Sequence, residues 1–419
     1  MKSQRWQRII PVALIMYTIA YVDRTNVTLA LTPKVSTMMK DLFMDDQMKG
    51  QAVGLFFFGY VLLQIPCGHW ATRWSARKVI SLCLVGWGVC AVACGLSRTF
   101  RQFEAGRFLL GVAESGVFPS MLVLLANWFP RSERARANAY WNLCQPLAVV
   151  ASALLTGALL DHWGWRTVIV LEGALPFLWL PIWWFCIRDR PREANWISAE
   201  ERDHLETTLR KEAEELEPPG AVPLWKKFCQ PGIAPVILLM IVINFLHNSL
   251  AYGCMTFFTS RLENRGYSAL QNGMLFALPY AFTALLMVLV SRHSDKVNER
   301  KMHVALTYVV SGVSLILSVS LKGHFWLSYV LLCLSIPGPS VALAPFWAIP
   351  TETLPRGAAG PAIGLINAFG NLGGFAGNFI VGSLMRATGS LELPFDDLGL
   401  GILIAAALAW WLPKPPPRR

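Results

Sequence analysis

The chain has 419 residues, of which 54% are hydrophobic and only 15% are charged. Soluble domains carry about a quarter of charged residues, so this composition excludes an ordinary soluble protein and predicts a polytopic membrane protein. The formal net charge is +11, but the basic residues form short clusters between apolar runs, where membrane topology explains them better than nucleic-acid binding does. The nine cysteines lack the spacing of disulfide or zinc sites, so we expect no metal site.

Windows of about 20 apolar residues predict twelve membrane-spanning helices. The spans are expected at Ile9 to Leu31, Gln51 to Ala71, Val79 to Ser97, Phe103 to Leu125, Asn138 to Leu160, Thr167 to Ile187, Ile233 to Thr259, Gln271 to Ser291, His303 to Leu321, Phe325 to Pro350, Gly357 to Met385 and Leu398 to Leu412. The first run is as long as a full span and contains Asp23 and Arg24, so we interpret it as a retained helix and not as a signal peptide.

The spans divide the chain into two six-helix bundles, residues 1–187 and 233–419, joined by a cytoplasmic linker at 188–232. Within the linker, Ser198 and Glu201 form a capping box that predicts a helix from Ala199 to about Leu216. Because this segment is strongly polar, we expect a solvated linker helix, with a partner-binding role as the alternative.

Clusters of Lys and Arg fall on one side of the predicted spans, which the positive-inside rule assigns to the cytoplasm together with both termini. The localisation predicted from this topology is the plasma membrane. Two stretches also look duplicated: residues 68–78 correspond to 291–301, 223 positions later, and residues 129–142 correspond to 354–367, 225 positions later. Two offsets that agree so closely indicate a parallel duplication of the bundles.

The duplicated loops GHWATRWSARK and SRHSDKVNERK resemble the motif G-x-x-x-D-R/K-x-G-x-R/K-R/K of the major facilitator superfamily. The first copy has Thr72 in place of the aspartate, whereas the second keeps Asp295. In that superfamily the loop braces helices that rock between inward-open and outward-open states; positive-inside topology is the alternative explanation for its basic residues. The resemblance implies a gating role for Arg73, Arg77, Lys78, Asp295, Lys296 and Arg300.

Four further stretches narrow the resemblance: IAYVDRTNVTLA, GRFLLGVAESGVFP, WFPRSERARANA, and GWRTVIVLEGALP followed by RDRPREANWISAEER. Together they resemble the anion:cation symporter family, whose members carry sugar acids, hydroxycarboxylates, aromatic acids and related anions, commonly with protons. This resemblance implies an all-α membrane protein with the major facilitator fold, twelve transmembrane helices in two pseudo-symmetric bundles.

Four charged residues lie at membrane depth: Asp23, Arg24, Arg107 and Glu114. Charges in this position are costly and normally serve a function. Our hypothesis is that Arg107 neutralises Asp23 or Glu114 in alternation, while Arg24 holds an incoming carboxylate. By resemblance, Asp23 and Glu114 handle the protons, because the proton affinity of a carboxyl changes with its burial and with nearby charges. The alternative is a static ion-pair network that holds two helices together.

The resemblance also implies that Tyr21, Tyr60 and Gln145 line the substrate cavity, with Trp347 and Asn367 from the second bundle. A structural role is the alternative for such polar and aromatic residues. His247 is a possible further site residue, although an intramembrane histidine can equally be a neutral hydrogen-bonding group. Glu172 and Glu352 lie near the ends of spans and receive no coupling role.

These observations predict a proton-coupled symporter that imports an organic carboxylate by alternating access. An exporter or antiporter of the same fold and a membrane receptor that binds the anion without transport are the alternatives. No HExxH motif, nucleophile elbow or phosphate loop occurs in the sequence, so we expect no enzyme activity. The expected partners are a small organic anion and the lipid bilayer, the protein is expected to be a monomer, and no cofactor is expected besides the coupling proton.

Overall fold

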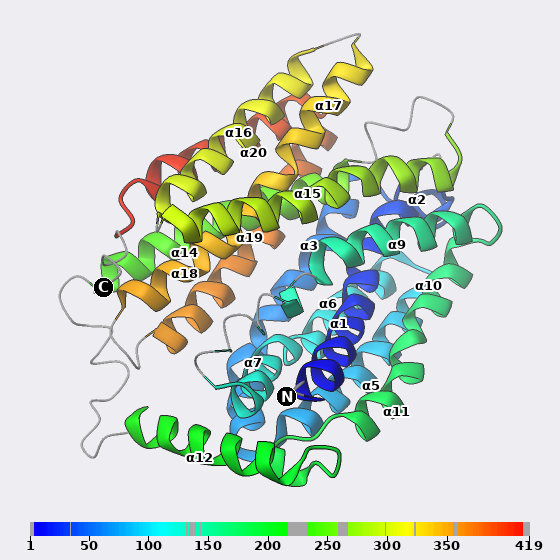
Figure 1. The fold of residues 1–419 in the computed structure, drawn as a ribbon. Coiled ribbons are helices and arrows are strands. Elements are labelled where there is room, and N and C mark those ends of the chain that lie inside the picture. Colours follow the sequence, from blue (N-terminus) through cyan, green and yellow to red (C-terminus); the bar gives the residue numbers. More distant parts are fainter. Residues whose placement is uncertain are drawn as a thin grey trace.

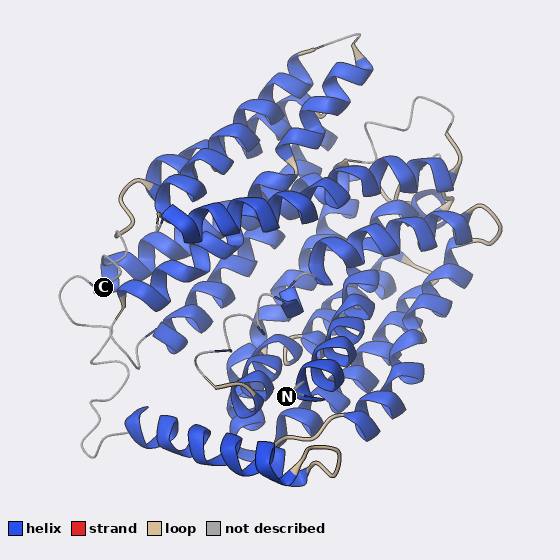
Figure 2. Ribbon diagram, in the orientation of Figure 1, coloured by secondary structure: helices blue, strands red, loops and turns tan. Residues whose placement is uncertain are grey.

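A computed structural model of the chain describes residues 4–33, 35–130, 133, 137, 140–142, 144–216, 233–258, 267–297, 299–321, 324–354 and 359–413. Every regular element in this part of the chain is a helix (Figure 2). The fold class predicted from the apolar runs is therefore confirmed.

The first bundle contains α1 (Gln4–Ala30), α2 (Met38–Asp41), α3 (Asp46–Leu62), α4 (Gln64–Trp70), a π-helical turn (Ala71–Ser75), α5 (Ala76–Gly95), α6 (Phe100–Glu114), α7 (Val117–Trp128), α9 (Cys144–Leu160), α10 (Trp165–Gly173) and α11 (Leu175–Cys186). The linker contains a 3₁₀ turn (Pro191–Glu193) and α12 (Ala199–Leu216). The second bundle contains α14 (Ile233–Phe257), α15 (Ala269–Val297), α16 (Lys301–Ser320), α17 (Phe325–Ser335), α18 (Pro337–Thr353), α19 (Ala359–Thr388) and α20 (Glu392–Ala409).

The twelve predicted spans correspond to these helices, and several spans are broken into two. The fourth span breaks after Glu114 into α6 and α7, the sixth at Ala174 into α10 and α11, and the tenth at Ile336 into α17 and α18. In the described part of the chain, 8 helical stretches are by themselves long and apolar enough to cross a membrane. Broken helices place main-chain polar groups inside the bundle, where side chains or ligands can use them.

The two bundles lie side by side, and α12 lies across one end of the first bundle (Figure 1). Helix α3 packs against α19, and α9 packs against α15. At the end away from α12, which we call the far end, polar contacts join the bundles: Asp161 accepts hydrogen bonds from the backbone N–H groups of Ala269 and Leu270, at 2.8 and 3.0 Å. Between another pair of helices, Arg386 of α19 forms an ion pair with Asp45, the residue before α3, at 3.3 Å. The far end is therefore closed by contacts between the bundles.

Glycines allow α14 and α19 to approach closely. A Cβ atom added at Gly373 or Gly377 would collide with main-chain atoms of Phe245 and Ser249, respectively. The Ser249 hydroxyl also donates a hydrogen bond to the Gly373 carbonyl at 3.0 Å. Small residues at this spacing are typical of close helix packing in membranes, and here they pack two helices of one bundle together.

The linker helix α12 has the predicted bounds but is not fully solvated, which corrects our expectation. Arg5 of α1 contacts Glu133 at 2.7 Å and Glu201 of α12 at 3.2 Å. Leu205 on the same helix is buried, and Trp128 stacks on Trp196 with ring centroids 5.0 Å apart. The capping box predicted the helix, but a few leucines among many polar residues were too weak a signal to predict its docking.

Candidate functional site

An arginine held by one carboxylate and several aromatic rings lies in the middle of the first bundle. Arg24 of α1 is 4% exposed. Its Nε and Nη2 atoms donate hydrogen bonds to Oε2 of Glu114, at 2.9 and 2.7 Å. The guanidinium carbon lies 4.8 Å from the Tyr21 ring centroid and 4.7 Å from that of Tyr60. The aromatic faces stabilise the cation by cation–π attraction where water is excluded.

Glu114 is the last residue of α6 and is completely buried. The helix is interrupted at Ser115 and Gly116, before α7 begins. A Cβ atom added at Gly116 would come within 2.8 Å of the Cys67 sulfur. The break therefore depends on a small residue at this point. Among the described residues, the second carboxylate oxygen of Glu114, Oε1, has no hydrogen-bond partner. One face of the carboxylate is thus available to a proton or a ligand.

Asp23 is 2% exposed and points in a different direction from Arg24, as expected for neighbouring residues on a helix. The indole N–H of Trp87 in α5 donates a hydrogen bond to its Oδ2 atom. Its Oδ1 atom has no partner in the described part of the chain. Arg107, which is 3% exposed, donates a hydrogen bond to the main-chain carbonyl of Asp23 at 3.0 Å.

The four charged residues lie together as expected, but the pairing is different. We expected Arg107 to contact a carboxylate and Arg24 to be free for substrate; instead Arg24 holds Glu114, and Arg107 contacts a main-chain oxygen. The reason is the rotation of about 100° between successive helical residues, which turns Asp23 toward α5 and Arg24 toward α6. The roles of these residues in transport and proton coupling stay predictions.

The remaining predicted substrate residues occupy several places. Tyr21 and Tyr60 belong to the Arg24 site. Gln145 of α9 donates a hydrogen bond to the Asn142 side chain at 3.3 Å. In the second bundle, Trp347 is half-buried beside Phe346, and the half-buried Asn367 accepts a hydrogen bond from Asn371 through its main-chain oxygen at 2.8 Å. His247 is buried with its Nδ1 atom 3.0 Å from the Tyr308 hydroxyl, which fits a structural histidine.

Sequence reasoning missed Phe56, whose ring centroid lies 5.2 Å from the Arg24 guanidinium carbon, and it also missed Trp87 and Tyr252. Trp87 binds Asp23, and a tryptophan in the middle of a span, away from the membrane interface, is the signal that would have indicated it. Tyr252 of α14 belongs to the second bundle, and its ring centroid lies 4.1 Å from that of Phe57 in α3. Phe57 in turn contacts Phe56, one of the rings around Arg24, with ring centroids 5.2 Å apart. No pattern in the sequence distinguished Tyr252 from other aromatic residues.

The first predicted gating loop is anchored by a residue outside its motif. The backbone N–H of Arg77 donates a hydrogen bond to Asp189 at 2.9 Å, and the Ser75 hydroxyl donates to the same carboxylate. Thr72 stands where the motif has an aspartate, and Asp189, which follows α11, supplies a carboxylate at the N-terminus of α5. A negative charge is favourable at this end of a helix.

The basic residues of the two loops differ in their contacts. The Arg77 guanidinium lies 4.1 Å from the Trp184 ring centroid, and Lys78 lies 5.2 Å from that of Trp74. Arg73 and Lys296 are exposed. In the second loop, Arg300 is buried and donates a hydrogen bond to the Ser294 hydroxyl at 3.1 Å. The side chain of Asp295 lies outside the described residues.

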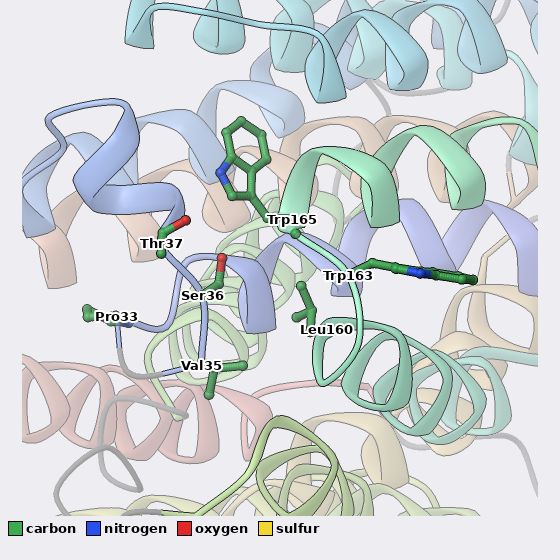
Figure 3. A pocket seen from close by; sticks show the side chains of 8 residues that line it. Pro33, Val35, Ser36, Thr37, Leu160, Trp163 and Trp165 are labelled. Atoms are coloured by element: carbon green, nitrogen blue, oxygen red, sulfur yellow. The ribbon is translucent and has the colours of Figure 1, made fainter.

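A pocket of about 240 Å³ opens at the far end of the first bundle (Figure 3). Its walls are the loop after α1 and the turn between α9 and α10, and they carry apolar and hydroxyl groups but no charged side chain. The lining residues are Pro33, Val35, Ser36, Thr37, Leu160, Trp163, Gly164 and Trp165. None of the predicted site residues is among them, so the Arg24 site and not this pocket is the candidate functional site.

Comparisons with known proteins agree with this description. The family model described as Major Facilitator Superfamily matches residues 13–378. A candidate tartrate transporter of Agrobacterium vitis is 31% identical over 408 residues, which cover 96% of this chain and 92% of that protein. A quinolone resistance transporter of Acinetobacter baumannii is 31% identical over 423 residues, with 96% and 92% covered. The crystal structure of a D-xylose–proton symporter has the same fold, with a TM-score of 0.75 and 13% identity over 97% of this chain and 98% of that one.

Proposed function

We propose that this chain, which belongs to the major facilitator superfamily, imports an organic carboxylate together with protons across the plasma membrane. Membership makes the chain a multi-pass membrane transporter and not an enzyme. The observation that carries the proposal is the buried Arg24–Glu114 pair, in which one cation is held by one carboxylate inside an aromatic cage.

The pair provides a simple coupling mechanism. Arg24 is a single buried cation that can bind the Glu114 carboxylate or the carboxylate of a substrate. When Glu114 takes up a proton it becomes neutral and releases Arg24, which then binds the incoming anion. Proton and anion therefore bind together, because either the ionised Glu114 or the anion compensates the arginine charge. Asp23, whose Oδ1 atom has no partner in the described part of the chain and whose main-chain carbonyl accepts a hydrogen bond from Arg107, is the second proton-handling group in this mechanism.

Relatives support the substrate class. Proteins similar to this chain are named as candidate transporters of tartrate, of galactarate and D-glucarate, and of sulfoacetate. All of these are small organic anions, which a buried guanidinium binds well through charge-assisted hydrogen bonds. These three relatives are bacterial, which supports the plasma membrane as the location.

The closed far end supports alternating access. Asp161 and Arg386 hold the two bundles together at the end that the positive-inside rule assigns to the outside. Separation of these contacts would expose the Arg24 site to that side, while the gating loops act at the opposite end. We propose that the protein functions as a monomer, because Arg24, Glu114 and the rings around them are buried inside a single bundle.

A proton-driven exporter is the second candidate function, since one relative with 31% identity is named a quinolone resistance transporter. The two functions differ in the direction of coupled flux. We would measure uptake of labelled tartrate, glucarate and a fluoroquinolone into proteoliposomes with and without an inward proton gradient. Accumulation of an acid driven by that gradient supports the importer, and expulsion of any of these compounds supports the exporter. Saturable binding without flux would contradict both and favour a receptor.

A further inference from the structure

Glu172 is a buried carboxyl group that the coupling mechanism does not use. It lies in α10 and is 1% exposed. Its Oε1 atom accepts a hydrogen bond from the Thr156 hydroxyl of α9 at 2.7 Å. In the described part of the chain its Oε2 atom has no hydrogen-bond partner, and no ion pair of Glu172 occurs there. A buried carboxylate without a cation is costly, so a group of this kind calls for a functional explanation.

Glu172 and Asp23 lie at the same depth. Glu172 is seven residues from Trp165 at the start of α10, and Asp23 is seven residues from Ala30 at the end of α1. At 1.5 Å per residue, both are about 10 Å inside the far-end tips of their helices. Helices α1 and α10 pack against each other, so the two buried carboxyl groups lie on neighbouring helices.

Two further polar side chains of α1 lie between Asp23 and the far end of the helix. Asn26 is three residues beyond Asp23 and therefore lies on the same side of α1, whereas Thr28 lies on the opposite side from Asn26. Both residues are buried, and Nδ2 of Asn26 and Oγ1 of Thr28 have no hydrogen-bond partner among the described residues. A buried amide with an unpaired donor, on the same side of α1 as a buried carboxyl group, is the kind of polar group found in intramembrane proton sites.

The surroundings of Glu172 contain few other charges. Asn26 and Asp23 face it from α1, and Thr156 faces it from α9. On α5, Trp87 contacts Asp23 instead. Glu172 also precedes the break at Ala174, as Glu114 precedes the break at Ser115. Both glutamates thus lie where a helix is interrupted, which is where transporters place their ion-binding groups.

We propose that Glu172 is an additional proton-binding group of this transporter, which takes a proton from the far end and exchanges it with Asp23. This inference rests on the proposed proton coupling. It assigns at least one proton to a site separate from the Arg24–Glu114 pair, so substrate is translocated with one proton more than that pair supplies.

The test is the number of protons moved per substrate. Purified protein in proteoliposomes loaded with a pH-sensitive dye is supplied with the labelled acid that it transports, and proton and substrate fluxes are measured together. Glu172→Gln keeps the shape and the acceptor for Thr156 but cannot ionise. We expect it to move one proton fewer per substrate and to flatten the pH profile of transport, while substrate counterflow remains.

Controls separate a proton site from a structural one. Thr156→Val removes the hydrogen bond and leaves the carboxyl, so we expect an unchanged proton ratio; a thermal-shift assay monitors folding of each variant. If Glu172→Gln does not fold, Glu172→Asp is measured, and a wild-type proton ratio together with a shifted pH profile supports the proposal. An unchanged ratio and pH profile in Glu172→Gln overturns the role of Glu172. Absence of substrate-driven proton movement in the wild type overturns the coupling proposal itself.

Discussion

Arg24 directs both its Nε and its Nη2 atom at a single oxygen of Glu114, at 2.9 and 2.7 Å, and leaves the other carboxylate oxygen without a partner in the described part of the chain. The pair is buried between α1 and α6 and is surrounded by aromatic rings. A cation held through one oxygen can be released when that carboxylate is neutralised, which distinguishes this pair from a fully satisfied structural ion pair.

Replacement of Arg24 by alanine should remove anion binding. It also leaves Glu114 buried without its cation, which typically costs about 3–5 kcal/mol of stability. Thermal unfolding and a binding titration with tartrate or glucarate measure the two effects. The double variant Arg24→Ala with Glu114→Gln should recover stability but not binding. Undiminished anion affinity in the folded double variant would contradict the assignment of Arg24.

Replacement of Glu114 by glutamine should abolish accumulation driven by a proton gradient while counterflow exchange persists. The glutamine carbonyl can still accept a hydrogen bond from Arg24, but the side chain cannot carry the coupling proton. Uptake into proteoliposomes at different external pH values measures this. Glu104→Gln on the same helix is the matched control, because Glu104 is only half-buried. Normal accumulation by the Glu114 variant would show that coupling resides elsewhere.

Replacement of Asp161 by alanine should loosen the contact between the bundles at the far end. The variant loses both hydrogen bonds to the N-terminus of α15, and loss of such a cap typically costs about 0.5–2 kcal/mol. Hydrogen–deuterium exchange at the start of α15 should therefore become faster. Asp41→Ala serves as the control, because the contacts of Asp41 with Trp165 and Arg166 lie within the first bundle. Equal exchange in wild type and Asp161→Ala would exclude a closing role.

We expect the stability of the protein to depend on pH through the carboxyl group of Asp41, the last residue of α2 between the first two spans. The Trp165 indole donates a hydrogen bond to its carboxylate at 2.8 Å and, with smaller contributions from Thr37 and Arg166, lowers the pKa of Asp41 below its ordinary value. Because the pKa is lower in the folded state, the stabilisation is complete above the unfolded pKa of about 3.9 and is lost as the pH falls through the folded pKa.

The measurement compares wild type with Asp41→Asn in thermal unfolding across this range. The difference in thermal stability between the two proteins should be constant at neutral pH and should shrink in acid. The group is partly exposed, so solvent screening keeps the difference small. A difference that grows as the pH falls would contradict the prediction.

Much of the fold followed from the apolar runs, because a membrane requires each span to satisfy its own backbone hydrogen bonds. The residues of the charged site were also predictable, since Asp23, Arg24, Arg107 and Glu114 are expensive at membrane depth and proved to be buried together. Sequence reasoning failed where a partner came from a distant helix. It left Trp87 out of the site, and it gave no role to Asp189, which anchors the first gating loop in place of the missing motif aspartate.

By itself, the sequence determined the membrane class, the twelve spans, the linker helix and the four charged residues of the site, because these depend on local composition and spacing. Only the tertiary structure decided which charges pair. Asp23 and Arg24 are adjacent in the chain, yet the rotation of α1 turns one toward Trp87 of α5 and the other toward Glu114 of α6. The packing of helices around α1 also determined that Glu172, which received no coupling role because it lies near the end of a predicted span, is a third buried carboxyl group on a helix that packs against α1.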